Sequence, residues 1–417
     1  MNIRMLGGFC MMGLAIAGCA TMQAPDNAAG GRGDTYAPGS FGDDLAFLTE
    51  HTDAFVLSDA SGNAQLIVVP EYQGRVMTST TGGMHGASYG WIHRDLIASG
   101  ESLPHMNPYG GEDRFWLGPE GGQFALYFEE GAPFEFDHWQ VPALIDTEPF
   151  NFVERTRDSA AFTKDATLTN YFGTQFFFRI DREVNLIDAE RAGDLFGLTD
   201  LAGIDTVGYE SVNTLTNTGT SAWTKESGLL SIWILGMFKP SAQTTLVIPI
   251  VAGEEAELGP KVNDAYFGKV PENRLRVEVD RLFFRGDGKY RSKIGVSPQR
   301  AKPVSGSYDA AGRVLTIVQF NRPTGVTDYV NSMWELQDAP YSGDAVNSYN
   351  DGPPEPGAEP LGPFYELETS SPAAALAPGE SITHVHRTFH FQGDESALNR
   401  ISTAVLGVSL MEFKEAF

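Results

Sequence analysis

The segment Gly110–Gly122 carries the residue types with which proteins usually grip a sugar. Arg114 offers a fork of hydrogen-bond donors, Trp116 offers a flat apolar face, and Asp113 and Glu120 offer acceptors. The glycines of the segment allow a ligand to approach the backbone closely. The segment therefore predicts a substrate-binding loop. The alternative is a structural loop in which Arg114 pairs with a neighbouring carboxylate and Trp116 belongs to the core.

Glu366 and Glu368 lie two positions apart in a stretch that reads as a strand. Side chains two apart on a strand point to the same face, so both carboxylates face one side of the predicted sheet. A second carboxylate on a half-buried face raises a pKa toward neutrality, as removal of a proton from a sugar hydroxyl requires. The pair is therefore a candidate acid/base site. The alternative is that one of the two is a solvated residue at the rim.

Three histidines, His384, His386 and His390, share one face of a later strand. A His-x-His pair on a strand is a known metal-binding arrangement, but the spacing fixes no third ligand. Three interpretations stay open: a zinc site, the polar wall of a cleft in which a histidine acts as an acid, and hydrogen-bonded histidines on a sheet. We expect neither a metal nor another cofactor.

The elements that must position these groups are short β-strands. Such stretches, rich in β-branched or aromatic residues, occur at 65–69, 123–128, 176–180, 244–250, 313–320 and 382–391. Gly, Pro, Asn and Asp interrupt the chain at intervals of about ten residues, which is typical of a sandwich or barrel. Residues 351–363 are too rich in proline and glycine to pair as a strand and predict an exposed loop.

A helix is predicted at the C-terminal end of this all-β chain. Leu398, Ile401 and Val405 recur at helical spacing within residues 396–407, after the capping residue Asp394. No repeat and no evident linker follow residue 45, so a single domain over residues 45–417 is the simpler prediction.

Composition limits the kinds of partner. The chain has 54 acidic and 29 basic residues, and its formal net charge of −25 makes nucleic acid an unsuitable partner. Its two cysteines, Cys10 and Cys19, lie near the N-terminus, so the rest of the chain has no disulfide and depends on its core. With 42% hydrophobic residues, the chain is large enough to bury one.

The N-terminus resembles a bacterial lipoprotein signal. Arg4 precedes an apolar stretch of secretory length at 5–17, which runs into Gly18 and Cys19. This pattern resembles the lipobox, which implies removal of residues 1–18 and an acylated Cys19 that anchors the protein to a membrane. Ala20 after the cysteine favours the outer membrane of the cell envelope, and residues 19–44 predict a flexible tether. The alternative is an ordinary signal peptide with a chance cysteine.

Several short, loose motifs resemble the galactose-mutarotase-like proteins, which are related to aldose 1-epimerases. Leu66–Ser79 resembles their opening pair of strands, Asn107–Gly122 their substrate loop, Gly208–Gly219 their central strand, and Phe364–Ser381 their late Leu-Glu segment. The resemblance spans most of residues 45–393. It implies an uncharacterised family with a β-supersandwich fold, in which two broad antiparallel sheets hold a sugar cleft on the concave one.

The resemblance also assigns roles to single residues. Leu367-Glu368 matches the catalytic Leu-Glu pair, which makes Glu368 the base. The sequence departs from the family at Ser231–Gly236, where related epimerases have a histidine acid and this chain has Trp233. We therefore expect Trp233, Glu366 and His384 to contact the substrate and His386 to supply the missing acid.

The predicted function is that of an exported lipoprotein that acts on a sugar or oligosaccharide by epimerase-, lyase- or glycosidase-like acid/base chemistry. The alternatives are a non-catalytic glycan-binding lipoprotein and a structural protein of the cell envelope. The leading prediction requires Arg114, Trp116, Glu368 and His386 to converge in one cleft, whereas the structural alternative predicts no polar concave cleft.

Overall fold

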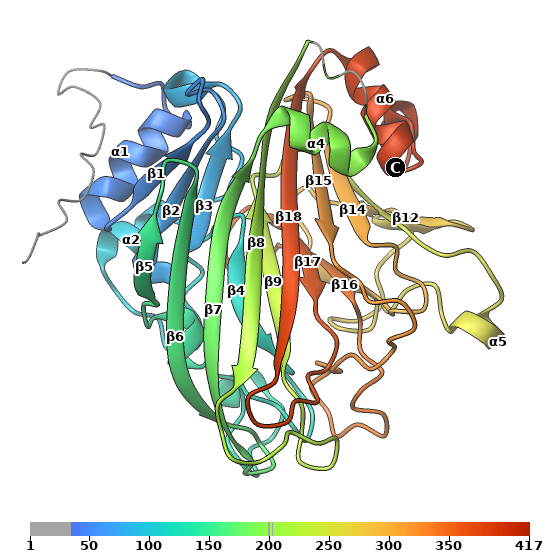
Figure 1. The fold of residues 1–417 in the computed structure, drawn as a ribbon. Coiled ribbons are helices and arrows are strands. Elements are labelled where there is room, and N and C mark those ends of the chain that lie inside the picture. The colour runs from blue at the N-terminus through green and yellow to red at the C-terminus, as the bar shows by residue number, and fades with distance from the viewer. Residues whose placement is uncertain (1–34, 199–200, 202) are drawn as a thin grey trace, which may run out of the picture. The chain divides into compact units, whose positions relative to one another are not determined.

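The computed structural model describes residues 35–198, 201 and 203–417 (Figure 1). Within them, one compact unit begins at Tyr36 and ends at Phe417. The predicted signal peptide (residues 1–18), Cys19 and most of the predicted tether lie outside the described residues. No helix in the described ranges is long and apolar enough to cross a membrane.

The largest layer of the unit is a ten-stranded antiparallel sheet, which forms the front of the view in Figure 1. Its strands, in spatial order, are β11 (Leu275–Val277), β12 (Arg281–Arg285), β10 (Thr244–Pro249), β14 (Val304–Asp309), β15 (Val314–Phe320), β18 (Ser381–Gly393), β8 (Ile204–Asn217), β7 (Gln175–Ile187), β6 (Ser159–Thr169) and β5 (Asn151–Arg155).

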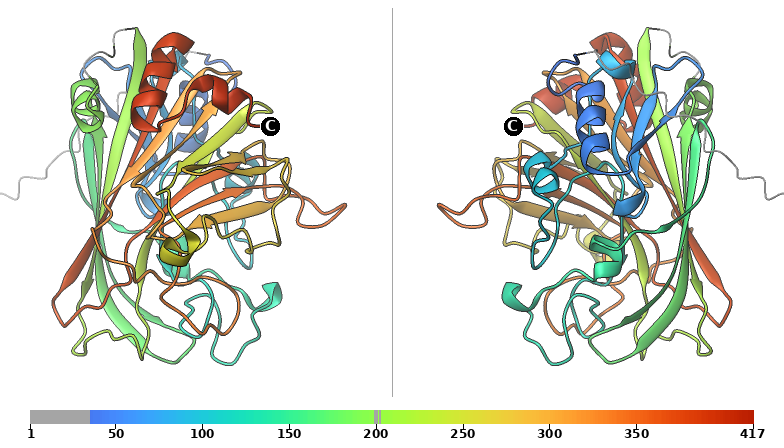
Figure 2. Two further views of the ribbon diagram at one scale, coloured as in Figure 1. Left: turned by 90° about the vertical axis from the view of Figure 1, so that its right-hand side faces the viewer. Right: turned by 90° about the vertical axis from the view of Figure 1, so that its left-hand side faces the viewer.

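A five-stranded antiparallel sheet lies against one face of the larger sheet (Figure 2). Its spatial order is β13 (Ser292–Val296), β16 (Val346–Asn350), β17 (Tyr365–Ser370), β9 (Ser231–Phe238) and β4 (Arg114–Gly118). All residues of these five strands are buried, so both faces of this sheet are covered. A third sheet has three strands: β1 (Phe55–Ser58), β2 (Gln65–Val69) and β3 (Arg75–Thr80).

Short helices lie at the ends and edges of the sheets. The α-helices are α1 (Phe41–His51), α2 (Arg94–Ser99), α3 (Ala143–Asp146), α4 (Ala189–Phe196), α5 (Glu255–Leu258), α6 (Glu395–Val405) and α7 (Leu410–Lys414). Three 3₁₀ turns are η1 (Pro70–Tyr72), η2 (Gly83–His85) and η3 (Phe136–His138). The predicted all-β class, with large antiparallel sheets and a helix near the C-terminus, is confirmed.

Strand alternation decides which side chains lie between the two large sheets. On β18, His384 and His386 hydrogen-bond to Thr369 on β17, so even-numbered residues of β18 face the smaller sheet. Phe389 and Phe391 point the other way, where they form one apolar cluster with Leu398 of α6. The predicted helix thus covers the outer face of the ten-stranded sheet, and Asp394 occupies its N-cap position as expected.

The fold begins earlier than the predicted boundary at residue 45. Helix α1 starts at Phe41, whose side chain is fully buried, and Ser40 caps it by accepting a hydrogen bond from the backbone N–H of Asp43. The prediction of a flexible tether up to residue 44 is therefore wrong in its last residues. A serine cap followed by acidic residues in the first turn is a helix-start signal that the glycine and proline content of this region obscured.

The predicted strand at 123–128 is also wrong. The stretch follows two glycines and folds into turns, in which Leu126 donates its backbone N–H to the carbonyl of Pro119. Its aromatic side chains still reach the core: Tyr127 is 1% exposed and donates its hydroxyl to the carbonyl of Leu117. The apolar residues of this stretch indicate that it is buried, but the turns that follow the two glycines determine its backbone conformation.

Candidate functional site

One face of the five-stranded sheet collects charged and aromatic side chains. Directly opposed residues in a sheet share a face, and the register places Trp116 opposite Trp233 and Arg114 opposite Leu235, which in turn opposes Glu368. Thr369 faces the ten-stranded sheet. Its even-numbered neighbours on β17 therefore face away from that sheet. We call this arrangement, on the face away from the large sheet, the polar row: Arg114, Trp116, Trp233, Lys293, Glu366 and Glu368.

Arg114 and Glu366 form a buried ion pair at one part of the polar row. Arg114 Nη2 lies 2.9 Å from Glu366 Oε1, and both side chains are almost inaccessible to solvent. The guanidinium also lies over the Trp116 ring, 4.3 Å from its centroid, a cation–π contact. Burial raises the pKa of Glu366 to about 8; Arg114 opposes this shift, whereas Glu368 adds to it.

One carboxylate oxygen of Glu368 is hydrogen-bonded, and the other has no hydrogen-bond partner. Its Oε2 accepts hydrogen bonds from Lys293 Nζ and from Trp233 Nε1, each at 3.0 Å. Its Oε1 has no hydrogen-bond partner, although the residue is 0% exposed. A buried carboxylate oxygen without a donor costs free energy, so such an atom is a candidate ligand contact.

Lys293 is the cation beside Glu368. Its ammonium lies 4.6 Å from the centroid of the Trp233 ring. Burial alone would lower the pKa of Lys293, but the surrounding carboxylates, Glu368 first, outweigh it and raise the pKa. Lys293 therefore stays protonated at neutral pH and stabilises negative charge at this part of the site.

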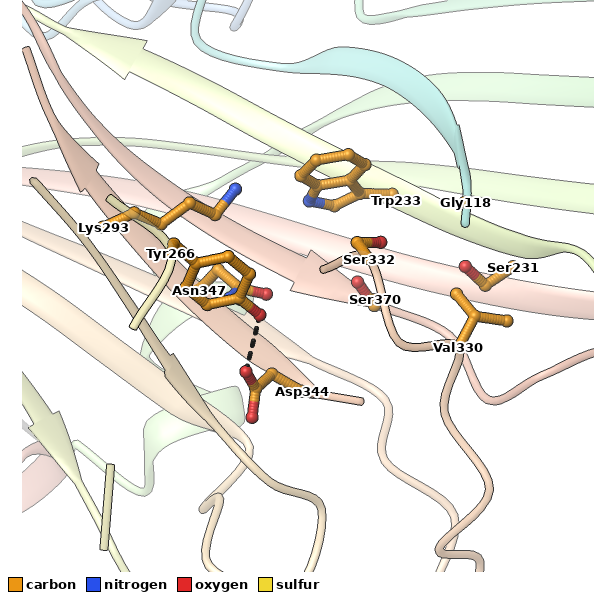
Figure 3. A pocket seen from close by; sticks show the side chains of 10 residues that line it. All are labelled: Gly118, Ser231, Trp233, Tyr266, Lys293, Val330, Ser332, Asp344, Asn347 and Ser370. Atoms are coloured by element: carbon orange, nitrogen blue, oxygen red, sulfur yellow. Dashed lines mark hydrogen bonds between the residues drawn. The ribbon is translucent and has the colours of Figure 1, made fainter. Parts of the chain in front are cut away.

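A small cavity of about 10 Å³ opens beside these residues (Figure 3). It is lined by Gly118, Ser231, Trp233, Tyr266, Lys293, Val330, Ser332, Asp344, Asn347 and Ser370. On one wall, Tyr266 donates its hydroxyl to Asp344 Oδ2 at 2.7 Å, and burial raises the pKa of Asp344 to about 6. The volume is close to the minimum that one water molecule needs.

The segment between β15 and β16, residues 321–345, closes the cavity, and we call it the cover segment. It has no helix or strand, and Val330, Ser332 and Asp344 line the cavity from it. The side-chain amide of Gln123 holds the cover segment by two hydrogen bonds to the backbone of Gln337. Gln123 Nε2 donates to the Gln337 carbonyl at 2.9 Å, and the Gln337 N–H donates to Gln123 Oε1 at 3.0 Å. A Cβ on Gly121 would lie 2.4 Å from the carbonyl oxygen of Met333, so only glycine allows this close approach.

The structure brings most of the predicted site residues together. Arg114, Trp116, Trp233, Glu366 and Glu368 lie in the polar row. Glu120 follows β4, its backbone N–H donates to Ser332 Oγ in the cover segment, and burial raises its pKa against the opposing effect of Lys293.

Asp113 lies elsewhere. It lies immediately before β4 and is fully buried, and its Oδ1 lies 2.6 Å from Arg182 Nη2. Its neighbour Arg114 points to the polar row, so alternation along β4 separates the two. Asp113 is thus a structural partner of a buried arginine, and the expectation that it contacts the substrate has no support in the geometry.

The structure does not bring His384 and His386 to Glu368 either. Both are buried between the large sheets and bond to Thr369 Oγ1 at 2.8 Å, on the opposite face of β17 from Glu368. Burial lowers the pKa of His384 to about 3 and that of His386 to about 4, so both are neutral near pH 7. The predicted convergence fails because a strand's alternation identifies residues that share a face, but not the layer that this face meets.

His390, the third histidine, is also hydrogen-bonded inside the sandwich. Its Nε2 lies 3.0 Å from Glu112 Oε2, and its Nδ1 lies 2.9 Å from Thr316 Oγ1. Among residues 35–198, 201 and 203–417, no three His, Cys, Asp or Glu side chains are grouped as metal ligands would be. Of the three open interpretations, hydrogen-bonded sheet histidines describe what is seen.

Three residues of the site were not anticipated: Lys293, Tyr266 and Asp344. Lys293 is the second residue of the fully buried strand β13. A lone lysine within a short strand-forming stretch is a detectable signal, because a buried lysine needs a carboxylate partner. Tyr266 and Asp344 come from irregular segments and carry no such signal.

The fold and the polar row together define an antiparallel β-sandwich protein with a buried acid/base cluster on its smaller sheet. The sequence matches a family of unknown function, DUF6786, over residues 39–417, and the chain belongs to that family. No curated protein matches the sequence.

Solved structures with a similar fold come from several bacteria. The Slr1438 protein of Synechocystis sp. PCC 6803 has 14% identity and a TM-score of 0.47, over 82% of this chain and 96% of that one. A putative aldose 1-epimerase of Escherichia coli K12 has 14% identity and a TM-score of 0.46, over 82% and 99%. A galactose mutarotase-like protein of Lactobacillus casei ATCC 334 has 11% identity and a TM-score of 0.46, over 81% and 100%.

Proposed function

We propose that the protein binds a carbohydrate at the polar row and acts on it by acid/base chemistry, with Glu368 as the base. The observation that carries this proposal is the state of the Glu368 carboxylate. One oxygen is fixed by Lys293 and Trp233, and the other is buried without a partner. A sugar hydroxyl can donate to that free oxygen, whereas the fixed one holds the group in place.

The neighbours of Glu368 suit this role. The Trp116 and Trp233 rings pack edge to face at 5.5 Å and provide apolar surface for a sugar ring. Lys293 stabilises negative charge that develops on a deprotonated sugar oxygen. Since His386 lies on the other side of β17, the proton donor must come from another group. Glu366 lies on the correct face beside Arg114, and burial raises its pKa to about 8, so this carboxyl can take up and release a proton near neutral pH.

A sugar can enter only if the cover segment moves. The cavity of about 10 Å³ holds little more than one water molecule, and a sugar ring is far larger. We propose that residues 321–345 open for the ligand, as loops over catalytic sites commonly do.

The small size of this cavity also favours an alternative function, in which the polar row has a structural role. Arg114–Glu366 and Lys293–Glu368 are matched ion pairs, and such a network can serve stability alone. In that case the protein is a structural component of the cell envelope. The intermediate alternative is a glycan-binding protein that binds at the polar row without turnover.

The test is a panel of neutral mono- and oligosaccharides, studied by calorimetry and by detection of products for the wild type and for Glu368→Gln. Glutamine keeps the shape and removes the base, so turnover should fall by about 10²–10⁴-fold while sugar affinity changes little. The matched control is Glu154→Gln on the exposed surface of β5, which should change neither. Binding without any product would support the non-catalytic alternative. A wild type that binds no sugar would support the structural one.

We also propose that the mature protein is a lipoprotein, anchored through Cys19 and located in the bacterial cell envelope. The support is the signal-like N-terminus, in which an apolar stretch of secretory length ends at Gly18-Cys19. The preference for the outer membrane depends on Ala20 alone.

A further inference from the structure

A second and larger cavity lies outside the polar row. Its volume is about 620 Å³, within the range of small-molecule sites. The residues of the loop 126–142 form most of it, and the other side is formed by Leu168 and Thr169 at the end of β6 and by Asn170 and Gly173 in the turn that follows. We call it the loop cavity.

The buried lining of the loop cavity is largely apolar and aromatic. It includes Leu126, Tyr127, Phe128 and Trp139, all less than 9% exposed. Tyr127 and Trp139 stack with ring planes 9° apart, and the Trp139 indole N–H has no hydrogen-bond acceptor. Such a lining offers flat faces to an apolar part of a ligand.

The formal charge of the loop cavity is negative. Three exposed carboxylates, Glu129, Glu130 and Asp137, belong to its lining, which contains no lysine and no arginine. They give this part of the chain three negative charges at neutral pH.

The two side-chain amides of the lining already donate to backbone carbonyls. Asn170 donates to the carbonyl of Ser227 at 3.0 Å, and Gln140 donates to the carbonyls of His105 and Val141 at 3.3 Å each. His105 Nδ1 lies 2.6 Å from the carbonyl oxygen of Trp139, so Nδ1 carries the proton. In the neutral ring, Nε2 is then one more acceptor.

From the aromatic lining and the three carboxylates, we propose that the loop cavity binds an organic cation in which an ammonium group is attached to a ring with an apolar face. The ammonium brings the positive charge that the three carboxylates lack as a partner, and the ring face covers the aromatic side chains. An amino sugar and an aryl quaternary ammonium share this chemistry. A neutral sugar leaves the three carboxylates without a counter-charge and is disfavoured.

The test compares ligands that differ in charge. Calorimetry on the purified domain uses a glucosamine disaccharide, its fully N-acetylated counterpart and phenyltrimethylammonium. We expect the two cations to bind and the neutral disaccharide to bind at least about tenfold more weakly. Binding should also weaken as salt is added, because the carboxylates are exposed. Selective binding of the aryl cation would identify a non-sugar ligand, and selective binding of the amino sugar would identify a glycan.

Two triple variants separate the cavity from the net charge. Replacing Glu129 and Glu130 by Gln and Asp137 by Asn should weaken cation binding by about tenfold, since exposed ion pairs each contribute modestly. The matched control is Glu254→Gln, Glu255→Gln and Glu257→Gln at α5, which removes the same charge from exposed positions outside the cavity lining. Equal binding of the neutral and cationic disaccharides, no binding of any probe, or equal losses in both triple variants would each overturn the proposal. Glu368→Gln should leave cation binding unchanged, so this test stands apart from that of the polar row.

Discussion

At the scale of single residues, the site depends on charges that are buried in pairs. Glu366 and Glu368 share a face as alternation predicts, and the sequence was sufficient for that. The lysine that neutralises Glu368 lies 75 positions away, and only the pairing of β13 with β16 and of β16 with β17 brings it there. No local pattern can specify a contact that depends on the strand order of a sheet.

Replacing Lys293 by Met should strongly destabilise the protein, because Glu368 would remain buried without its counter-ion. The free energy of unfolding in urea should fall by about 3–5 kcal/mol. The control Lys225→Met breaks an exposed pair with Asp328, half-accessible on both sides, and should cost less than about 1 kcal/mol. A second substitution, Glu368→Leu, should restore much of the loss in Lys293→Met. Equal effects of the two single lysine substitutions would contradict the buried ion pair.

His384 and His386 should make stability depend on pH. Their pKa values in the folded protein, about 3 and about 4, lie below the ordinary value of 6.5, so the unfolded chain binds more protons between these limits. The contribution of these two neutral histidines to the free energy of unfolding is complete above pH 6.5 and decreases as the pH falls toward 4. Urea denaturation from pH 7 to 4 should therefore show a smaller loss of stability for the double variant His384→Gln, His386→Gln than for the wild type. A parallel pH dependence of the two proteins would refute this.

At the scale of elements, the sequence indicated strands wherever β-branched and aromatic residues were concentrated, and β2 was predicted at its observed bounds. The failure at 123–128 shows the limit of this approach, since an apolar stretch can be buried in turns. The cover segment was not anticipated at all. Its position depends on contacts such as Gln123–Gln337, which join residues 214 positions apart.

Gln123→Ala should loosen the cover segment without unfolding the protein. It removes the two hydrogen bonds to the Gln337 backbone, each of which contributes roughly 0.5–1.5 kcal/mol. Hydrogen exchange measured by mass spectrometry should become about tenfold faster or more in peptides from residues 321–345. The control Gln140→Ala removes side-chain hydrogen bonds to backbone carbonyls in another loop and should leave those peptides unchanged. Unchanged exchange in Gln123→Ala would show that other contacts hold the segment.

At the scale of the whole molecule, the compact unit that starts at Tyr36 has its own hydrophobic cores. The described part of the chain contains no cysteine, so its stability rests on packing and hydrogen bonds. The strands and the terminal helix follow from composition and periodicity, and the resemblance implied two broad sheets. Composition and periodicity do not specify which face of each sheet packs against the other sheet. For this reason the histidines were predicted on the wrong side of the smaller sheet.

Cys19→Ala should release the protein from the membrane fraction without altering its thermal unfolding midpoint. The proposed acyl chains hold the protein to lipid, and the folded unit begins well after them. Fractionation in high salt followed by thermal melting of the released protein tests both parts. A Cys19→Ala protein that remains in the membrane fraction would contradict the proposed lipid anchor.

The strand order of the large sheet has a consequence for the time course of synthesis. Strand β18, the last in the chain, lies between β15 and β8. It joins one half of the sheet, β5 to β8, to the other half, which consists of β10, β11, β12, β14 and β15. Until residues 381–393 have been made, the two halves present unpaired edges to each other and to other chains. The protein must therefore complete its sheet at the very end, and a chain that stops before residue 381 should aggregate rather than fold.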